Sequence, residues 1–392
     1  MARHKPAWRR VLTGRRLRWI ATLALVRMFP GMGRLLGVFP RGVDLVAAAD
    51  RVLVDEHLLL PATDLGNDRV FLDQCLPNDS TDPAIDLDRG IDTGARTGLF
   101  STAWIDMVTG SILLPAAGAT VQMRSAGVNW NTCSTGWRRK QVPIQGLVFA
   151  PQTTVQYFHL LTENGLRLID LLERRVLDGP LTVVKPPDRT SVEAAMYAGI
   201  ATLYPDVEVQ QVPGRVMVQP EQAVGHFPRG DHWEWPPVTP VLARQLAAAF
   251  QASYPELPSQ EGEGLLYLSR QSAKLRRVRN GDDLERALQM SGYKVLEASD
   301  TNHPEQIARF ASARIVVAVH GAGLTNLLFC RPGTHVVEIF PANFVKSPYW
   351  WICRQLGLNH IPVIGGPGDY DQHFDVDVDA VVAALDRAHA AA

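Results

Sequence analysis

The stretch at residues 317–341, VAVHGAGLTNLLFCRPGTHVVEIFP, constrains the fold of this 392-residue chain most strongly. Apolar residues leading into His320 predict a buried strand, and the apolar run Val336–Phe340 predicts another. Between them, a Gly-Ala-Gly turn at 321–323 opens a short helix near Leu324. Small residues at the carboxyl end of a parallel strand, before a helix N-terminus, leave backbone N–H groups open to a phosphate. The stretch therefore predicts a phosphate-binding edge in an α/β fold.

The C-terminal half alternates short apolar strands with helices. We expect strands at Leu265–Ser269, Tyr293–Leu296, Ile315–Val319, Val336–Phe340 and His360–Ile364. Such close alternation predicts a parallel sheet with helices on both faces. Ligands of these sheets bind at the carboxyl ends of the strands. Arg270, His320 and Glu338 lie at or near such ends, so we expect them at one edge of the sheet.

Residues 226–240 are rich in Pro, Trp and charge and interrupt both periodicities, which predicts an interdomain linker. The predicted organisation is a basic arm, an N-terminal α/β domain, a C-terminal α/β domain and a final amphipathic helix, at 1–42, 43–235, 236–377 and 378–392. The N-terminal domain is less regular. It shows strand-like runs at Arg51–Val54, Arg69–Leu72 and Ser111–Leu114, a helical stretch at Gln156–Leu172, a strand at Leu181–Val184 and a helix at Ser191–Ala198.

Charge is distributed unevenly along the chain. The net charge of −1 gives no global basic field for a nucleic acid. Residues 1–42 nevertheless hold ten Lys and Arg and no acidic residue. Their apolar run, Trp19–Val26, is shorter than the roughly 20 residues that span a bilayer, and no signal cleavage site follows. The arm is either an amphipathic segment on an anionic membrane surface or a surface helix docked on its own domain.

The spacing of the cysteines indicates the cellular compartment that we expect for the protein. Cys75, Cys133, Cys330 and Cys353 lie far apart and show neither C-x-x-C nor Cys/His zinc spacing. They are typical of small buried side chains in a reducing cytoplasm. We expect a cytoplasmic protein, at the inner face of the membrane if the basic arm binds lipid.

A dehydrogenase or a hydrolase could use a glycine turn of this kind, and the sequence favours neither class. The turn nearly matches the dinucleotide fingerprint G-x-G-x-x-G, but Asn326 replaces the third glycine and the turn does not open its domain. An HGGG-type oxyanion loop would need a G-x-S-x-G nucleophile elbow, which the chain lacks. The alternative without a ligand is a tight strand–helix turn. Glu338, at the end of the next strand, favours a binding site because carboxylates commonly hold ribose hydroxyl groups.

A basic run follows the strand that ends at Arg270. Arg276, Arg277 and Arg279 precede Asn280. Guanidinium groups suit diphosphate oxygens better than an ammonium group does. The strand-end position of Arg270 indicates function, whereas Arg276 and Arg277 fit a phosphate contact and a solvated basic loop equally well.

A third constellation is a His–Glu pair. His159 and Glu163 are four residues apart, so they share one face of the predicted helix. A carboxylate beside an imidazole fixes its orientation and raises its basicity, as a general base requires. A purely structural pair inside the helix has the same spacing. No H-E-x-x-H motif is present, so no zinc site is predicted.

Together, the strand end at Arg270, the R-R-x-x-N run and the block HGAGLTNLLFCRPGTHVVEIFP resemble glycosyltransferase family 61, in particular bacterial members of capsular or exopolysaccharide type. The resemblance covers about Leu265–Gly365 strongly, and earlier only Tyr157–Arg167. It implies a GT-B architecture, with two Rossmann-like domains and a cleft between them. The domain at 43–235 would lie on the acceptor side, the domain at 236–377 would bind the nucleotide sugar, and the final helix at 378–392 would cross back to the N-terminal domain. It also implies an inverting, metal-independent transferase that uses a UDP-linked sugar as co-substrate and a glycan as acceptor.

The resemblance assigns roles to individual residues. His159 or Glu163 would take the proton of the acceptor hydroxyl. Glu338 would hold the ribose, and His320 would contact phosphate or donor sugar. The other donor-binding residues would be Arg270, Arg277, Asn280, Gly321, Ala322, Gly323, Leu324 and Asn326.

The chain departs from the family pattern after Asn280, where Gly281 replaces the usual Glu. It also has Leu160 and Gly165-Leu166 where an aromatic residue and Leu-Pro are common. These departures leave two other interpretations open: a non-catalytic nucleotide-sugar-binding partner in polysaccharide assembly, and another nucleotide-sugar enzyme such as an epimerase or hydrolase.

Overall fold

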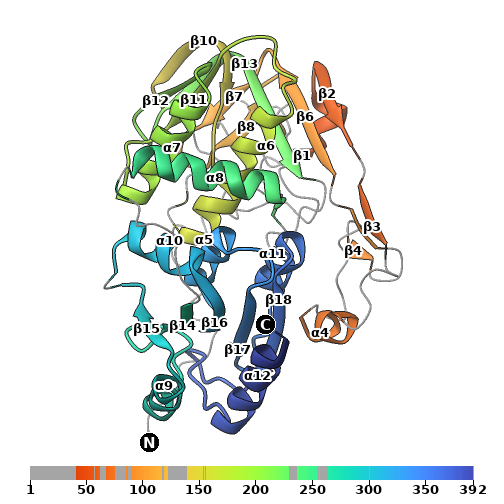
Figure 1. Ribbon diagram of the computed structural model, residues 1–392. Coiled ribbons are helices and arrows are strands. Elements are labelled where there is room, and N and C mark those ends of the chain that lie inside the picture. Colours follow the sequence, from red (N-terminus) through yellow and green to blue (C-terminus); the bar gives the residue numbers. More distant parts are fainter. Residues whose placement is uncertain are drawn as a thin grey trace, which may run out of the picture.

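A computed structural model gives the fold of the chain (Figure 1). It describes residues 41–391 except 57, 62–67, 76–84, 87–89, 93, 117–118, 122–138, 153, 155, 229–235, 255, 257–263 and 300. The basic arm up to residue 40, Cys133 and part of the predicted linker therefore lie outside the described residues. Within the described part, no helix has the length and apolar character that crossing a membrane requires.

The N-terminal unit is built on a ten-stranded mixed sheet. Its strands are β1 (Arg41–Val43), β2 (Arg51–Asp55), β6 (Ala95–Phe100), β7 (Trp104–Asp106), β8 (Ser111–Leu114), β9 (Ala119–Val121), β10 (Gln141–Phe149), β11 (Leu181–Lys185), β12 (Val207–Gln211) and β13 (Met217–Pro228). The neighbours β12, β11, β10 and β13 are parallel, in the 3-2-1-4 order of a Rossmann half. On its other side, β13 pairs antiparallel with β6 and β7.

Helices cover the parallel part of this sheet. They are α3 (Leu45–Ala48), α5 (Tyr157–His159), η4 (Leu160–Leu166), α6 (Arg167–Glu173), α7 (Ser191–Leu203) and α8 (Pro240–Ser253). The sequence places α8 in the C-terminal domain, but the helix packs on α7 and also contacts η5 (Ala322–Phe329) of the other unit. A Cβ at Gly199 would lie 1.9 Å from the Ala249 carbonyl oxygen, so the two helices touch backbone to backbone there.

The C-terminal unit is a five-stranded, fully parallel sheet in the order β15-β14-β16-β17-β18. Its elements are β14 (Gly264–Ser269), α9 (Gly281–Met290), β15 (Lys294–Glu297), α10 (His303–Ala311), β16 (Ala313–Val319), η5 (Ala322–Phe329), β17 (His335–Phe340), α11 (Pro348–Leu356), β18 (Asn359–Ile364) and α12 (Val378–Ala391). The five predicted strands are all confirmed. The strand order reverses between β14 and β16, and ligands of such sheets bind at the carboxyl ends of the strands that flank this point.

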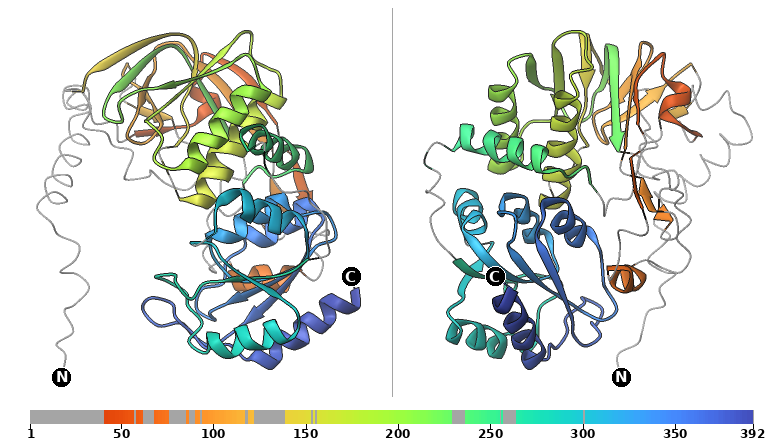
Figure 2. Two further views of the ribbon diagram at one scale, coloured as in Figure 1. Left: turned by 60° about the vertical axis from the view of Figure 1, so that its left-hand side comes forward. Right: turned by 45° about the vertical axis from the view of Figure 1, so that its right-hand side comes forward.

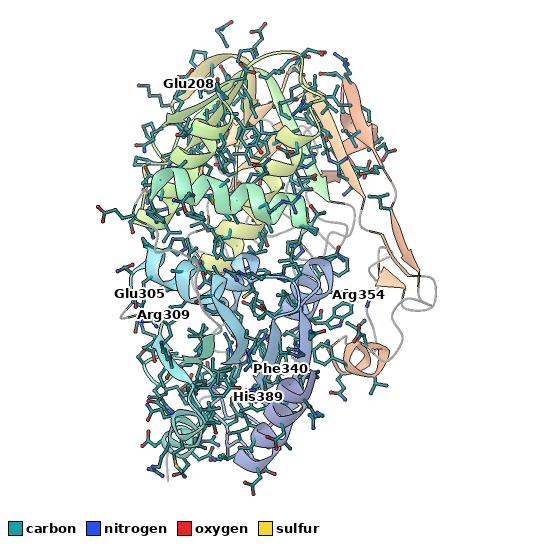
Figure 3. All side chains as sticks on the ribbon, viewed as in Figure 1. Glu208, Glu305, Arg309, Phe340, Arg354 and His389 are labelled. Carbon is teal, nitrogen blue, oxygen red and sulfur yellow. The ribbon has the colours of Figure 1, made fainter. Side chains whose placement is uncertain are left out.

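A smaller element joins the two units. A three-stranded sheet of β3 (Leu59–Pro61), β5 (Gly90–Asp92) and β4 (Ile85–Asp86) leads into α4 (Asp68–Cys75), which lies beside the C-terminal unit (Figure 2). The predicted strand at 69–72 is wrong, because this segment is part of α4. Apolar side chains of α4 are buried against aromatic residues of β17 and α11. Arg354 of α11, labelled in Figure 3, donates to Asp68 over 3.1 Å.

The tail helix is present as predicted but does not cross to the N-terminal domain. The buried face of α12, formed by Val381, Ala384, Leu385 and Ala388, belongs to the core of the C-terminal sheet. α12 contacts β17, β18 and α9, because its apolar stripe matches the open face of that sheet. The two α/β units confirm the predicted α/β class of GT-B type, and the cleft between them stays a prediction.

Candidate active site

The carboxyl ends of β14 and β16 bring Arg270 against the glycine turn. A Cβ on Gly321 would lie 2.0 Å from Arg270 Nη1, so only glycine leaves room for the guanidinium group. Arg270 Nη2 donates to the Leu275 carbonyl oxygen over 3.0 Å. Its Nε is buried without a hydrogen-bond partner among the described residues. Burial lowers the pKa of Arg270 to about 10, and a partly buried, incompletely paired cation favours an anionic ligand.

The backbone of the turn offers N–H groups next to this cation. Leu324 was predicted to offer its N–H to a phosphate. This N–H instead donates to the Gly321 carbonyl oxygen over 2.9 Å. The described residues give no acceptor to the N–H groups of Gly321, Ala322 and Gly323. The predicted phosphate-binding backbone is therefore shorter by one residue.

Arg276, rather than Arg277, lies at this turn. Arg276 Nε donates to the His320 carbonyl oxygen over 2.9 Å, and its guanidinium group lies 5.1 Å from the centre of the Phe344 ring. The residue adopts a left-handed backbone conformation with φ of 58°. By contrast, Arg277 is exposed and contacts His373. The basic run gave the two residues equal weight and the family resemblance assigned Arg277, because the left-handed turn that directs Arg276 inward leaves no simple sequence signal.

Asn280 stabilises a loop instead of facing the turn. Its Nδ2 donates to the Val376 carbonyl oxygen over 2.8 Å, and its Oδ1 accepts from the Val376 N–H over 3.0 Å. The same two segments pair through a β-bridge between Val278 and Phe374. The R-R-x-x-N run therefore fixes the conformation of the loop that carries Arg276.

Glu338 is fully buried behind His320, not at a place where it could hold ribose. His320 Nδ1 lies 2.6 Å from Glu338 Oε1, and His360 Nε2 lies 2.7 Å from Glu338 Oε2. Burial raises the pKa of Glu338 well above its usual range and lowers that of His360 to about 3. Burial also lowers the pKa of His320, and neighbouring cations, Arg276 first, lower it further. The predicted ribose contact at Glu338 is thus replaced by a contact that orients His320.

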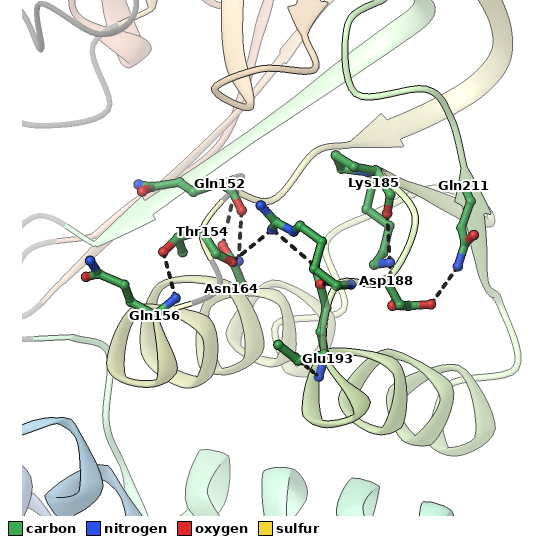
Figure 4. A network of polar contacts seen from close by, with 11 residues as sticks. Gln152, Thr154, Gln156, Asn164, Lys185, Asp188, Glu193 and Gln211 are labelled. Carbon is green, nitrogen blue, oxygen red and sulfur yellow. Dashed lines mark hydrogen bonds and ion pairs between the residues drawn. The ribbon is translucent and has the colours of Figure 1, made fainter. Parts of the chain in front are cut away.

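The His159–Glu163 pair is present on the N-terminal unit. His159 Nδ1 lies 2.6 Å from Glu163 Oε1, and both side chains are partly exposed. The pair lies where α5 passes into η4, a π-helical segment, and such segments are frequent at functional sites. Asn164 fixes this helix to the end of β10 through two hydrogen bonds of 2.9 Å with the backbone of Gln152 (Figure 4).

The two groups lie on neighbouring parts of the two units. The Tyr349 ring packs against Phe158, at 5.8 Å between ring centres, and against His320, at 5.3 Å. Tyr157, next in sequence, donates its hydroxyl to Asn326 Oδ1 over 2.5 Å. Asn326 is buried in this contact, so it connects the helix of His159 to η5 instead of facing the donor.

His303 extends the contact between units and gives it a pH dependence. Its Nε2 lies 2.8 Å from the Tyr157 hydroxyl, and burial lowers its pKa to about 4. An unfolded chain binds the proton near pH 6.5. The stabilising effect of neutral His303 is therefore complete above that pH and is lost as the pH falls toward 4.

His303→Gln should reduce this pH dependence. Between pH 7 and 5 the titration of His303 should remove about 2 kcal/mol of unfolding free energy from the wild-type protein. Between pH 7 and 5 the variant should lose about 2 kcal/mol less unfolding free energy than the wild-type protein. Urea unfolding at both pH values measures this difference. Above pH 7 the difference between the two proteins should stay constant. Equal losses between pH 7 and 5 would contradict the assignment.

Metal ligands are not grouped in the part of the chain that the structure describes. No set of three or more His, Cys, Asp or Glu side chains there could hold a metal ion. Metal independence itself stays a prediction.

Comparisons with known proteins give a family match over part of the chain. Residues 157–337 match the family model described as Glycosyltransferase 61. A search of curated proteins gave no match. Among solved structures, the chain is similar to E. coli heptosyltransferase WaaC with ADP, with 9% sequence identity and a TM-score of 0.33, over 64% of this chain and 99% of that one. A TM-score this low supports no argument about fold or function.

The family match begins at Tyr157 and ends in β17. It therefore includes Arg270 and the glycine turn, which follow the carboxyl ends of β14 and β16. It also includes His159 on α5. The family match covers the residues of this site, and the protein is a glycosyltransferase.

Proposed function

We propose that this enzyme transfers a sugar from a UDP-sugar, with inversion at the anomeric carbon, to a hydroxyl group of a bacterial surface or extracellular glycan. The observation that carries the donor side is the contact of the partly buried Arg270 guanidinium group with Gly321 at the strand-order reversal. A diphosphate there would be held by Arg270, Arg276 and the N–H groups of the glycine turn. The same groups would stabilise the charge that develops on the leaving diphosphate.

The acceptor side rests on the His159–Glu163 pair. The acceptor hydroxyl must lose a proton as it attacks, and a base within hydrogen-bond distance is needed to take it. His159 with Glu163 is the partly exposed imidazole–carboxylate pair on the helix that contacts η5. In this arrangement the hydroxyl oxygen forms a bond to the anomeric carbon, the bond from that carbon to the diphosphate breaks, and the proton passes to the pair.

A transfer assay tests the proposal. Nucleotide sugars are first screened for stabilisation of the folded protein, since a ligand that binds only the folded state raises its melting temperature. The stabilising donor is then incubated with candidate glycans, and the anomeric configuration of the product is read by NMR. We expect nucleotide release that requires an acceptor and a product of inverted configuration. Retained configuration would contradict inversion, and donor conversion without an acceptor would favour an epimerase or a hydrolase.

A further inference from the structure

Glu338 forms hydrogen bonds with two imidazoles in the interior of the C-terminal unit. One of its oxygens faces His320 Nδ1 at 2.6 Å and the other faces His360 Nε2 at 2.7 Å. Each of these contacts must contain one proton. With both histidines neutral and Glu338 ionised, these protons reside on His320 Nδ1 and His360 Nε2, and the group carries one negative charge. We call Glu338, His320 and His360 the carboxylate–imidazole group.

The ring of His320 is fixed on several sides. It stacks on Phe340, with ring centres 5.2 Å apart, and it packs against Phe344 and Tyr349. Its backbone N–H donates to the Ile339 carbonyl oxygen. With Nδ1 bound to Glu338, Nε2 is the ring nitrogen left for a ligand, and the described residues provide it with no hydrogen-bond partner.

The surroundings of this nitrogen are cationic. The charged or titratable side chains that face the group from neighbouring elements are Arg270 after β14, Arg276 in the following loop, Lys346 before α11, and Tyr349 and Cys353 of α11. Three of the five are cations, and they belong to the surface that we assign to the donor diphosphate. While Glu338 is ionised, His320 carries its proton on Nδ1 and presents only the lone pair of Nε2 to the diphosphate. A lone pair facing a phosphate oxygen is repulsive.

We propose that the carboxylate–imidazole group takes up one proton from solvent when a nucleoside diphosphate binds, and that His320 then donates Nε2–H to the diphosphate. This inference rests on the proposed function. The added proton changes the charge of the group from −1 to zero, so it removes repulsion toward the anion and creates one hydrogen bond. Glu338 is then a positioning residue that acts through His320, and His360 holds its second oxygen.

Calorimetry of UDP binding measures this uptake. Titrations at pH 8.5 in two buffers of different ionisation enthalpy give the number of protons bound with the nucleotide. The terminal phosphate of UDP is already ionised there, because its second pKa is about 6. Wild-type protein should take up about one proton per UDP, and its affinity should fall up to tenfold per pH unit above pH 8.5.

Glu338→Gln is the matched variant. Its side-chain amide can donate to His320 Nδ1 and its carbonyl oxygen can accept from His360, so both contacts persist without the negative charge. The variant should bind UDP with an uptake near zero and a flat pH profile. His320→Gln, which should also show no uptake, serves if the first variant does not fold.

The outcomes separate the inference from the proposed function. UDP binding without proton uptake by the wild-type protein, or uptake that persists in Glu338→Gln, would overturn the inference and leave the donor site intact. Failure of UDP, ADP and GDP all to bind the wild-type protein would contradict the proposed function, and the inference with it.

Discussion

Arg270→Ala should lower kcat/KM for the sugar donor by about 10²- to 10³-fold, the usual effect of removing one group that stabilises developing charge. The guanidinium group follows β14 and touches Gly321, so it lies where the leaving diphosphate gains negative charge. The variant removes the partly buried cation itself and leaves no unpaired buried charge behind. The fold should therefore persist. Kinetics with the donor identified by screening, together with a melting curve, check both expectations.

Two arginine variants provide the controls. Arg286→Ala removes a cation that is exposed on α9 and paired with Asp283, and it should leave kcat/KM unchanged. Arg276→Ala should impair donor turnover, whereas Arg277→Ala, in the exposed contact with His373, should have a much smaller effect. Wild-type donor turnover in folded Arg270→Ala would rule out the phosphate site described above.

His159→Ala should lower kcat by about 10²- to 10⁴-fold, the range typical of a general base, while the affinity for UDP stays unchanged. The side chain lies on α5 of the N-terminal unit, whereas the proposed diphosphate site belongs to the C-terminal sheet. The variant therefore affects proton removal and not donor binding. Pre-steady-state turnover and calorimetric UDP affinity separate the two effects.

Glu163→Gln distinguishes the two members of the pair. If His159 takes the proton, Glu163 acts by orienting its ring, and the Gln variant should keep more activity than His159→Ala. If Glu163 takes the proton, the order reverses. Gln156→Ala, an exposed position at the start of the same helix, is the control and should retain wild-type kcat. Full kcat in both His159→Ala and Glu163→Gln would place the base elsewhere.

The C-terminal sheet could be predicted from sequence because its strands are short, apolar and separated by capped helices. The run from 315 to 319 is buried on both faces, which gives an uninterrupted apolar signal. The segment at 69–72 was predicted wrongly as a strand. Its residues Phe71 and Leu72 are buried against Trp350 and Trp351, and a tertiary contact of this kind overrides the local pattern.

The site could be predicted from the sequence only for residues that directly follow the end of a strand. Arg270 and the glycine turn follow strand ends, so parallel topology alone brings them together. Glu338 lies two residues before the end of β17, and the side to which its carboxylate points depends on His360 of the neighbouring strand. His360 was read only as the first residue of a strand, since nothing in its local sequence shows that it faces Glu338. Arg276 differs from Arg277 only by a backbone conformation that the sequence does not reveal.

A structure of the protein with bound UDP tests the central claim most directly. We expect the β-phosphate within hydrogen-bond distance of Arg270 and of the N–H groups of Gly321 to Gly323, with His320 Nε2 facing the diphosphate. UDP bound with its diphosphate away from the carboxyl ends of β14 and β16 would contradict the account.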